Sequence, residues 1–192
     1  LGLGGDTLKS TAEDLLFNRA LPLNSYKTSR FTLDKDSPNA LVMQTSIGQG
    51  NTLVSPMHMA LITSAIANDG VLMKPTMIDK IVNNSGDTVR ETEKTEYKRL
   101  MTRNEANILG KLMKNVVENG TASALNGRGY TVAGKTGSAE IDENGSSHSW
   151  FVGYSNVDDP DIAIAVIVEN GGTGSEAAVP IAADVFDAYY FD

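Results

Sequence analysis

The sequence contains no cysteine and only two histidines among its 192 residues. Without cysteine, the chain can form neither disulfides nor zinc sites that depend on thiolates. The two histidines, His58 and His148, lie far apart in the sequence. We therefore expect each of them to be a packing or surface residue rather than a metal ligand.

Long apolar runs and clusters of basic residues are also missing. The longest apolar run covers residues 162–168, which suits a strand, whereas a membrane-spanning helix needs about 20 apolar residues. The 24 acidic residues outnumber the 16 basic ones, which gives a formal net charge of −8. Nucleic acid is therefore not an expected partner, because phosphate contacts need clustered Lys and Arg.

What is present fits one globular domain, or most of one. Apolar residues make up 41% of the chain and charged residues 21%, as is usual for globular domains. The chain begins with a glycine-rich stretch at Leu1 that has neither an initiator Met nor the basic region of a signal peptide. We therefore expect a further segment of the protein upstream of this chain.

The first two thirds of the chain predict helices, an irregular segment and a hairpin. Ser55 and Pro56 are typical of a helix start, and Thr102 with Glu105 forms a capping box. The helix after this box carries Ile108, Leu112 and Val116, at the spacing of one helical face. The predicted helices cover residues 7–17, 56–68 and 103–119, the irregular segment covers 18–44, and the hairpin strands cover 77–82 and 88–91.

The last third predicts an antiparallel sheet followed by a helix. Strands are expected over residues 130–140, 149–154 and 162–169, joined by short turns at 142–145 and 158–160. The third strand is apolar throughout, which is typical of a central strand covered on both faces. A final helix is expected from Ala177 to about Tyr190. The fold class is therefore α+β, an antiparallel sheet flanked by helices.

One stretch of the first predicted strand carries recognisable chemistry, Lys135-Thr136-Gly137-Ser138. Side chains alternate along a strand, so the hydroxyls of Thr136 and Ser138 share one face and can bind a carboxylate, while Lys135 points from the other. Gly137 would let another backbone lie close by. Such an edge can hold an extended peptide and its terminal carboxylate, although the tripeptide alone also fits an ordinary strand with a solvated lysine.

A series of further motifs accompanies this strand, in an order that resembles the penicillin-binding protein transpeptidases along nearly the whole chain. The pattern is most similar to the monofunctional, class B type. The matching stretches are Ser46-Ile47-Gly48-Gln49-Gly50, Val54-Ser55-Pro56, Ala67-Asn68-Asp69-Gly70-Val71, Lys74-Pro75, Val117-Glu118-Asn119-Gly120-Thr121-Ala122, Ala133-Gly134-Lys135-Thr136-Gly137-Ser138-Ala139-Glu140, His148-Ser149-Trp150-Phe151-Val152-Gly153-Tyr154, Glu169-Asn170-Gly171-Gly172 and Ala177-Ala178-Val179-Pro180.

The resemblance implies that residues 1–192 form the C-terminal part of a serine β-lactamase/transpeptidase-like fold. In this family a serine attacks the stem peptide of peptidoglycan, and an amine of a second stem resolves the acyl-enzyme. Lys135 would assist proton transfer and attract the carboxylate, Thr136 and Ser138 would bind that carboxylate, and the Ser138 N–H would be an oxyanion donor.

The resemblance also implies the surroundings of the protein. The expected partners are the stem peptide, β-lactam antibiotics, the N-terminal part of the same protein and the cell-wall synthesis machinery. No cofactor is expected. The expected location is the extracytoplasmic face of the bacterial membrane, through an anchor outside this chain.

The chain departs from the family pattern in three ways. No serine is followed three residues later by lysine, so the nucleophile motif is absent. One Ser-x-Asn sequence exists, from Ser37 to Asn39, but it follows rather than precedes the stretch at residues 1–17, so we interpret it as a coincidence. Ser138 stands where threonine is more usual, and it keeps both a hydroxyl and an N–H.

Other functions remain open at this point. A β-lactam sensor domain would share the fold and bind the antibiotic without turnover. A non-catalytic paralogue with a transpeptidase-like fold would hold a partner or the septal machinery. A D,D-carboxypeptidase or β-lactamase would belong to the same superfamily, although the Gly48-Gln49-Gly50 loop and the long segment before it favour the transpeptidases.

Overall fold

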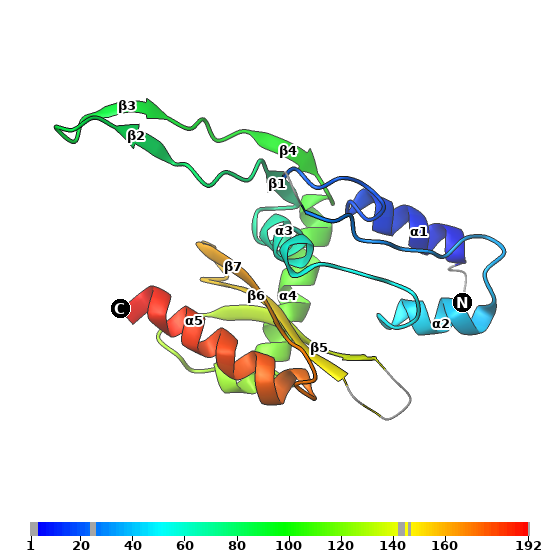
Figure 1. Cartoon of the computed structure of the whole chain (residues 1–192). Helices are drawn as coiled ribbons and strands as arrows, with labels where there is room; N and C mark the ends of the chain where they lie inside the picture. Colours follow the sequence, from blue (N-terminus) through cyan, green and yellow to red (C-terminus); the bar gives the residue numbers. More distant parts are fainter. Residues whose placement is uncertain (1–3, 24–25, 142–144, 146, 192) are drawn as a thin grey trace.

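The computed structural model describes residues 4–23, 26–141, 145 and 147–191. Its centre is a three-stranded sheet with helices on both faces, and a long two-stranded arm projects from it (Figure 1). Helices α3 (Pro56–Ala67) and α4 (Arg103–Asn119) cover one face, and α5 (Val179–Phe191) covers the other. The predicted class, an antiparallel sheet flanked by helices, is confirmed.

The sheet is the antiparallel meander that the sequence predicts. It consists of β5 (Val132–Glu140), β6 (Ser147–Ser155) and β7 (Ile162–Val168), in that order. Lys135 is paired with Val152 and Gly137 with Trp150, in a register without a bulge. The predicted turn at 142–145 falls mostly on residues 142–144, which lie outside the described residues.

The position of β7 corrects one prediction. Its apolar run predicts a central strand covered on both faces, but β6 is the central strand and, among the described residues, β7 pairs with β6 alone. All seven residues of β7 are only half-buried. The apolar sequence of β7 is typical of a fully buried strand, but the described part of the chain buries it only in part.

The main core lies between the sheet and α5. Phe151 of β6 and Phe186 of α5 are both fully buried there. The ring of Phe151 lies across the paired glycines Gly134 and Gly153, where a Cβ would come within 2.3 Å and 2.7 Å of its Cζ atom. Glycine at both positions therefore makes room for the ring.

Helix α4 begins at the predicted capping box, and both of its hydrogen bonds are present between Thr102 and Glu105. Its buried face, however, differs from the predicted one, because Ile108 is 50% and Leu112 is 60% exposed. One position of the face that the helix turns toward the sheet has room only for glycine, since a Cβ on Gly110 would lie 2.6 Å from the Tyr154 hydroxyl. The buried residues of α4 are Ala106, Gly110, Met113 and Val117.

Helix α3 begins and ends as the sequence predicts. The Ser55 hydroxyl accepts a hydrogen bond of 3.2 Å from the His58 N–H, and Pro56 occupies the first turn. After the helix, Gly70 takes a φ of +84°, and a Cβ there would lie 2.2 Å from the Met101 carbonyl oxygen. This glycine is therefore required by both its conformation and its close neighbour.

The N-terminal segment builds a second core against α3. Helix α1 (Gly5–Asp14) is close to its predicted position, whereas α2 (Asn39–Ser46) overlaps a segment predicted to be irregular. Helix α2 has little amphipathic pattern and buries only Thr45, so periodicity could not reveal it. Within the described ranges, no helix combines the length and the apolarity that a membrane crossing needs. The second core contains Leu16, Phe17, Leu21, Leu61, Ile62, Leu72 and Leu100.

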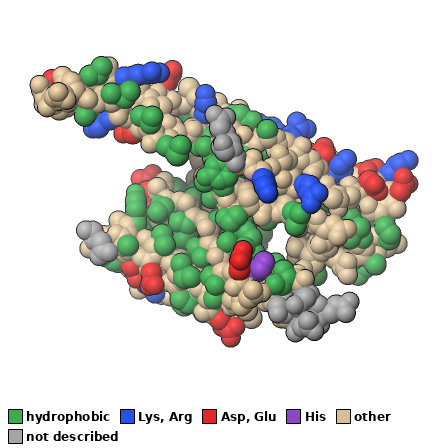
Figure 2. Space-filling model, in the orientation of Figure 1, with side chains coloured by type: hydrophobic (Ala, Val, Ile, Leu, Met, Phe, Trp, Pro, Cys, Tyr) green, Lys and Arg blue, Asp and Glu red, His purple; other side chains and the backbone are tan. Residues whose placement is uncertain are grey.

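The arm consists of two antiparallel pairs, one after the other along the same two segments (Figure 1). At its base β1 (Val71–Met73) pairs with β4 (Glu96–Arg99), and further out β2 (Lys80–Val82) pairs with β3 (Thr88–Glu91). The outer pair confirms the predicted hairpin, and every residue in it is exposed. Figure 2 shows hydrophobic side chains among charged ones along this arm.

Candidate active site

The Lys-Thr-Gly-Ser stretch lies on β5, which forms one edge of the sheet in the described part of the chain. Lys135 and Ser138 are exposed, and Thr136 and Gly137 are half-buried. Thr136 and Ser138 are paired with Phe151 and Ser149, which face α5 and the turn before it, so the two hydroxyls share a face as predicted. Lys135 lies on the opposite face, the side of α3 and α4.

The Thr136 hydroxyl meets a partner that the sequence did not indicate. Its oxygen lies 2.5 Å from the hydroxyl oxygen of Thr121, which follows the end of α4. Thr121 belongs to the Asn119-Gly120-Thr121 stretch already noted among the motifs, but that motif did not indicate a contact with Thr136. This bond fixes the Thr136 side chain from outside the sheet.

Ser138 lies against the backbone of a second segment. Its hydroxyl oxygen accepts a hydrogen bond of 3.3 Å from the N–H of Gly174, the first residue of the short turn η2 (Gly174–Ala178) that leads into α5. A Cβ on Gly174 would lie 2.8 Å from the Gly137 carbonyl oxygen. The close backbone approach predicted at Gly137 is therefore present, and the approaching residue is Gly174. The Ser138 hydroxyl still has its own proton to donate.

The outer edge of β5 receives two side-chain donors. Lys135 Nζ donates to the Thr136 carbonyl oxygen at 2.8 Å. Gln49 Nε2, from the Gly48-Gln49-Gly50 loop, donates to the Ser138 carbonyl oxygen at 3.3 Å. The bond from Gln49 joins residues 89 positions apart in the sequence. The Gly48-Gln49-Gly50 motif gave no indication of which strand the loop would contact.

His58 is a packing residue of α3, and His148 is a residue of β6 that contacts the loop after β7. His58 is fully buried in α3, and its Nε2–H donates to the Leu15 carbonyl oxygen at 2.7 Å. Burial lowers the pKa of His58, and the hydrogen bond to Leu15 offsets this only in part. His148 Nδ1 accepts a hydrogen bond of 3.1 Å from the Asn170 N–H. Neither contact suggests a metal ligand, and the described residues contain no cluster of three metal-binding side chains.

Ser37, in the lone Ser-x-Asn sequence, belongs to a local turn. Its hydroxyl accepts a hydrogen bond of 2.9 Å from the Asp34 N–H and donates to the Asp34 carboxylate at 3.0 Å. These two bonds occupy the hydroxyl within its own loop. The turn gives Ser37 a structural role.

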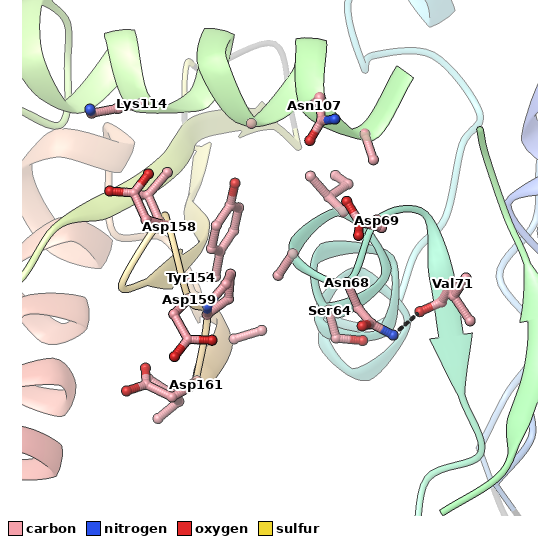
Figure 3. Close-up of a pocket in the computed structure, with 18 of the residues that line it drawn as sticks. Ser64, Asn68, Asp69, Val71, Asn107, Lys114, Tyr154, Asp158, Asp159 and Asp161 are labelled. Atoms are coloured by element: carbon pink, nitrogen blue, oxygen red, sulfur yellow. Dashed lines mark hydrogen bonds between the residues drawn. The ribbon is translucent and has the colours of Figure 1, made fainter. Parts of the chain in front are cut away.

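A cavity of about 850 Å³ lies between the end of α3, helix α4 and the β6–β7 turn, at the end of the sheet away from Ser138 (Figure 3). In Figure 3, Asp158 and Asp159 of the β6–β7 turn face Asn68 and Asp69 at the end of α3, with Lys114 of α4 beside them. None of the four residues of the Lys-Thr-Gly-Ser stretch lines this cavity. We therefore place the candidate site at the edge of β5, because the chemistry of its side chains identifies a site better than the size of a cavity does.

A partly buried polar network of Tyr130, Arg128 and Asp187 holds α5 to the segment that precedes β5. The Tyr130 hydroxyl donates to the Asp187 carboxylate at 2.5 Å, and Arg128 makes an ion pair with the same carboxylate. Burial and this carboxylate raise the pKa of Tyr130 to about 12. The hydrogen bonds from Tyr130 and Arg128 lower the pKa of Asp187. The C-terminal helix is thereby fixed to the segment that enters β5.

Comparison with known proteins identifies the family. A family model described as the penicillin binding protein transpeptidase domain matches residues 2–187. The chain belongs to this family. Penicillin-binding protein 3 of Bacillus subtilis is 32% identical over 178 residues, which cover 88% of the chain and 25% of that protein. Peptidoglycan D,D-transpeptidase PbpA of Mycolicibacterium smegmatis is 29% identical over 192 residues, covering 94% and 38%.

Solved structures of penicillin-binding proteins share the fold. The imipenem acyl-enzyme complex of penicillin-binding protein A from M. tuberculosis superimposes with a TM-score of 0.81 at 26% identity. It covers 95% of this chain and 41% of that one. The resemblance stated from the motifs is thus confirmed, and so is the transpeptidase-like fold. The chain spans between a quarter and about two fifths of the length of the curated penicillin-binding proteins named above.

Proposed function

We propose that residues 1–192 are the C-terminal part of a peptidoglycan D,D-transpeptidase and supply its substrate strand. The observation that carries the proposal is the edge of β5, where the exposed Lys135 and Ser138 lie beside Thr136 in a family-typical order. A strand edge can take up an extended peptide by strand addition, and a cation next to hydroxyls suits the terminal carboxylate of that peptide.

The proposed reaction needs a serine from outside this chain, since no serine here is followed three residues later by lysine. The serine oxygen attacks the carbonyl of the penultimate D-Ala, an ester forms, and the amide bond to the last D-Ala breaks. That D-Ala leaves as an amine, and its nitrogen takes up the proton that the serine hydroxyl has lost. An amine of a second stem peptide then attacks the ester, forms the cross-linking amide and returns a proton to the serine.

Each residue of the strand has a proposed part in this reaction. Lys135 attracts the substrate carboxylate and assists proton transfer at the serine. The hydroxyls of Thr136 and Ser138 bind the carboxylate, and the Thr121 contact holds the first of them in place. The Ser138 N–H donates to the oxyanion, a contribution that is typically worth about 10²–10³ in rate. A β-lactam would be attacked in the same way and would remain attached.

The half-buried β7 and the open cavity support an incomplete core. We propose that the upstream part of the protein covers this surface and brings the nucleophile to β5. We also propose that the protein acts at the extracytoplasmic face of the bacterial membrane, with the cell-wall synthesis machinery, through an anchor outside this chain. The relatives named above are transpeptidases and penicillin-binding proteins, which favours catalysis over the sensor and scaffold alternatives.

Denaturing intact-mass spectrometry after incubation with penicillin tests the proposal. Two samples are compared: this chain of 20.5 kDa alone, and the complete protein, meaning this chain together with its upstream part. We expect the complete protein to gain one antibiotic mass and the isolated chain to gain none. A gain of mass on the isolated chain would place the nucleophile within residues 1–192, and an unmodified complete protein would remove the proposed activity.

The folding of the isolated chain is a second test. We expect it to be inactive and poorly folded, because β7 and the cavity wall stay exposed without the upstream part. Thermal unfolding followed by circular dichroism measures this. A sharp, cooperative transition of the isolated chain would contradict the proposed incomplete core.

A further inference from the structure

The outer edge of β5 has its carbonyl groups occupied by the chain itself. Lys135 Nζ donates to the Thr136 carbonyl oxygen, and Gln49 Nε2 donates to the Ser138 carbonyl oxygen. In an antiparallel strand, the N–H and C=O of one residue point to the same side, and successive residues alternate. The N–H groups of Thr136 and Ser138 therefore also face this edge, and no described side chain accepts a hydrogen bond from them.

The two occupying side chains differ in what they can do for the strand. Lys135 belongs to β5 and contacts the residue next to it, so its bond cannot fix the strand relative to the rest of the molecule. Gln49 comes from another segment and therefore can. Among the described residues, its bond is the one side-chain contact from another element to the open-edge backbone at Ser138.

The loop that carries Gln49 is itself firmly held. The backbone N–H of Gln49 donates to the Gln44 carbonyl oxygen at 3.0 Å, which ties the loop to the end of α2. Gly48 and Gly50, on either side, take φ values of +85° and +77°, which other residues rarely adopt. Gln49 is half-buried although both of these neighbours are exposed. The loop thus turns one side chain inward, toward β5.

We propose that Gln49 is a positioning residue for the active site, which holds the β5 backbone at Ser138 so that its N–H keeps the direction needed for the oxyanion. The inference rests on the proposed function, because the oxyanion is a property of that reaction. A donor serves catalysis only if it is already aimed at the place where charge develops. In the described part of the chain, β5 pairs only with β6, so its other edge has no neighbouring strand. The hydrogen bond from Gln49 restrains β5 from that edge.

Replacement of the Gln49 amide in the complete protein tests this role. Gln49→Met keeps the length of the side chain and removes its donor. We expect the rate of acylation by a β-lactam to fall about 10-fold, a fraction of the full loss of an oxyanion donor. The dissociation constant of the initial complex should stay within about 2-fold, since Lys135 and the hydroxyls that bind the carboxylate are unchanged. Stopped-flow acylation over a range of antibiotic concentrations separates the two constants.

Gln44→Met is the matched control, because Gln44 is an exposed residue of α2 that supplies only its backbone carbonyl to the loop. It should acylate like the wild type. Gln49→Glu is the second variant: its carboxylate cannot donate at pH 7 but can when protonated. The acylation rate of Gln49→Glu relative to Gln49→Met should therefore rise between pH 7 and pH 5.

The outcomes separate the two proposals. If the wild type is not acylated at all, the proposed function fails. If the wild type is acylated and Gln49→Met acylates equally fast, Gln49 has no positioning role and the proposed function stands. If both constants worsen together and Gln49→Glu shows no recovery at low pH, Gln49 has a merely structural role, and the inference is overturned.

Discussion

The central sheet and the arm are both antiparallel β-structure, yet their surroundings are opposite. Phe151 in the middle of the sheet is fully buried, with helices on both faces. Every residue of β2 and β3 in the arm is exposed, and Met77, between β1 and β2, is 96% exposed. An isolated two-stranded hairpin is only marginally stable in water. Burial therefore makes the sheet a rigid support for the site, whereas the arm should tolerate change.

The largest expected effect is on the rate of acylation, when a lysine is removed from the site and, for comparison, from the arm. In the complete protein, Lys135→Ala should lower the second-order rate of acylation at least about 100-fold, because it removes a donor and a positive charge from the substrate edge. Lys80→Ala, on the exposed β2, is the matched control and should leave the rate unchanged. Fluorescent penicillin labelling measures both, and a Lys135→Ala rate close to wild type would show that the site lies elsewhere.

The next effect concerns stability. Phe151→Ala should lower the free energy of unfolding of the complete protein by about 3–5 kcal/mol, because the emptied space beside Gly134 and Gly153 is closed on both sides. Val89→Ala on the arm, where the side chain is 66% exposed, should change it by less than about 0.5 kcal/mol. Denaturant unfolding compares the two variants. Equal losses would mean that the arm is packed against another part of the protein.

A smaller loss is expected from the network behind the sheet. Tyr130→Phe removes the hydroxyl that donates to Asp187. It should cost about 1–2 kcal/mol, the lower part of the range for a hydrogen bond to a charged group, because the Asp187 side chain is 38% exposed. Tyr97→Phe is the control, because Tyr97 lies on β4 of the arm and is 44% exposed. Thermal unfolding at pH 7 measures the difference. A Tyr130→Phe protein as stable as the Tyr97→Phe control would show that the network adds nothing to stability.

The smallest expected effect is on how the folding stability depends on pH, through His58 in the second core. The pKa of His58 is lower in the folded state than in the unfolded chain, whose histidines have a pKa near 6.5. Between these two values the unfolded state binds more protons, so His58 contributes a loss of stability as the pH falls below about 6.5. His58→Gln keeps a donor for Leu15 and cannot titrate. Its melting temperature should fall less between pH 7 and pH 5.5 than that of the wild type, and identical slopes would contradict this.

Local patterns in the sequence predicted local structure well. The capping box at Thr102, the helix start at Ser55 and the alternation of Thr136 and Ser138 each depend on neighbouring residues, and the structure confirms all three. The family order of the motifs predicted the fold, because it combines many such stretches. The roles of Lys135 and Ser138 in the reaction stay predictions.

What the sequence did not reveal depends on residues that are distant along the chain. Ile108 and Leu112 form an apolar face of α4, but the helix packs on the sheet through the face that carries Gly110 and Met113, where Tyr154 lies close to the helix. The contact between Gln49 and Ser138 has no local signature at all. The apolar sequence of β7 predicted burial, and it could not say which part of the protein would provide it.

The approach of Gly174 to Gly137 has a consequence for the way the molecule opens. Because backbone lies on backbone there, and Ser149 also accepts a hydrogen bond of 3.0 Å from the Ala178 N–H, α5 cannot leave the sheet without releasing the back of the substrate strand. In hydrogen exchange, the amides of α5 and of the part of β5 around Gly137 should therefore exchange as one cooperative unit, with a common opening free energy. Helix α5 and the proposed substrate strand would then share a single lifetime.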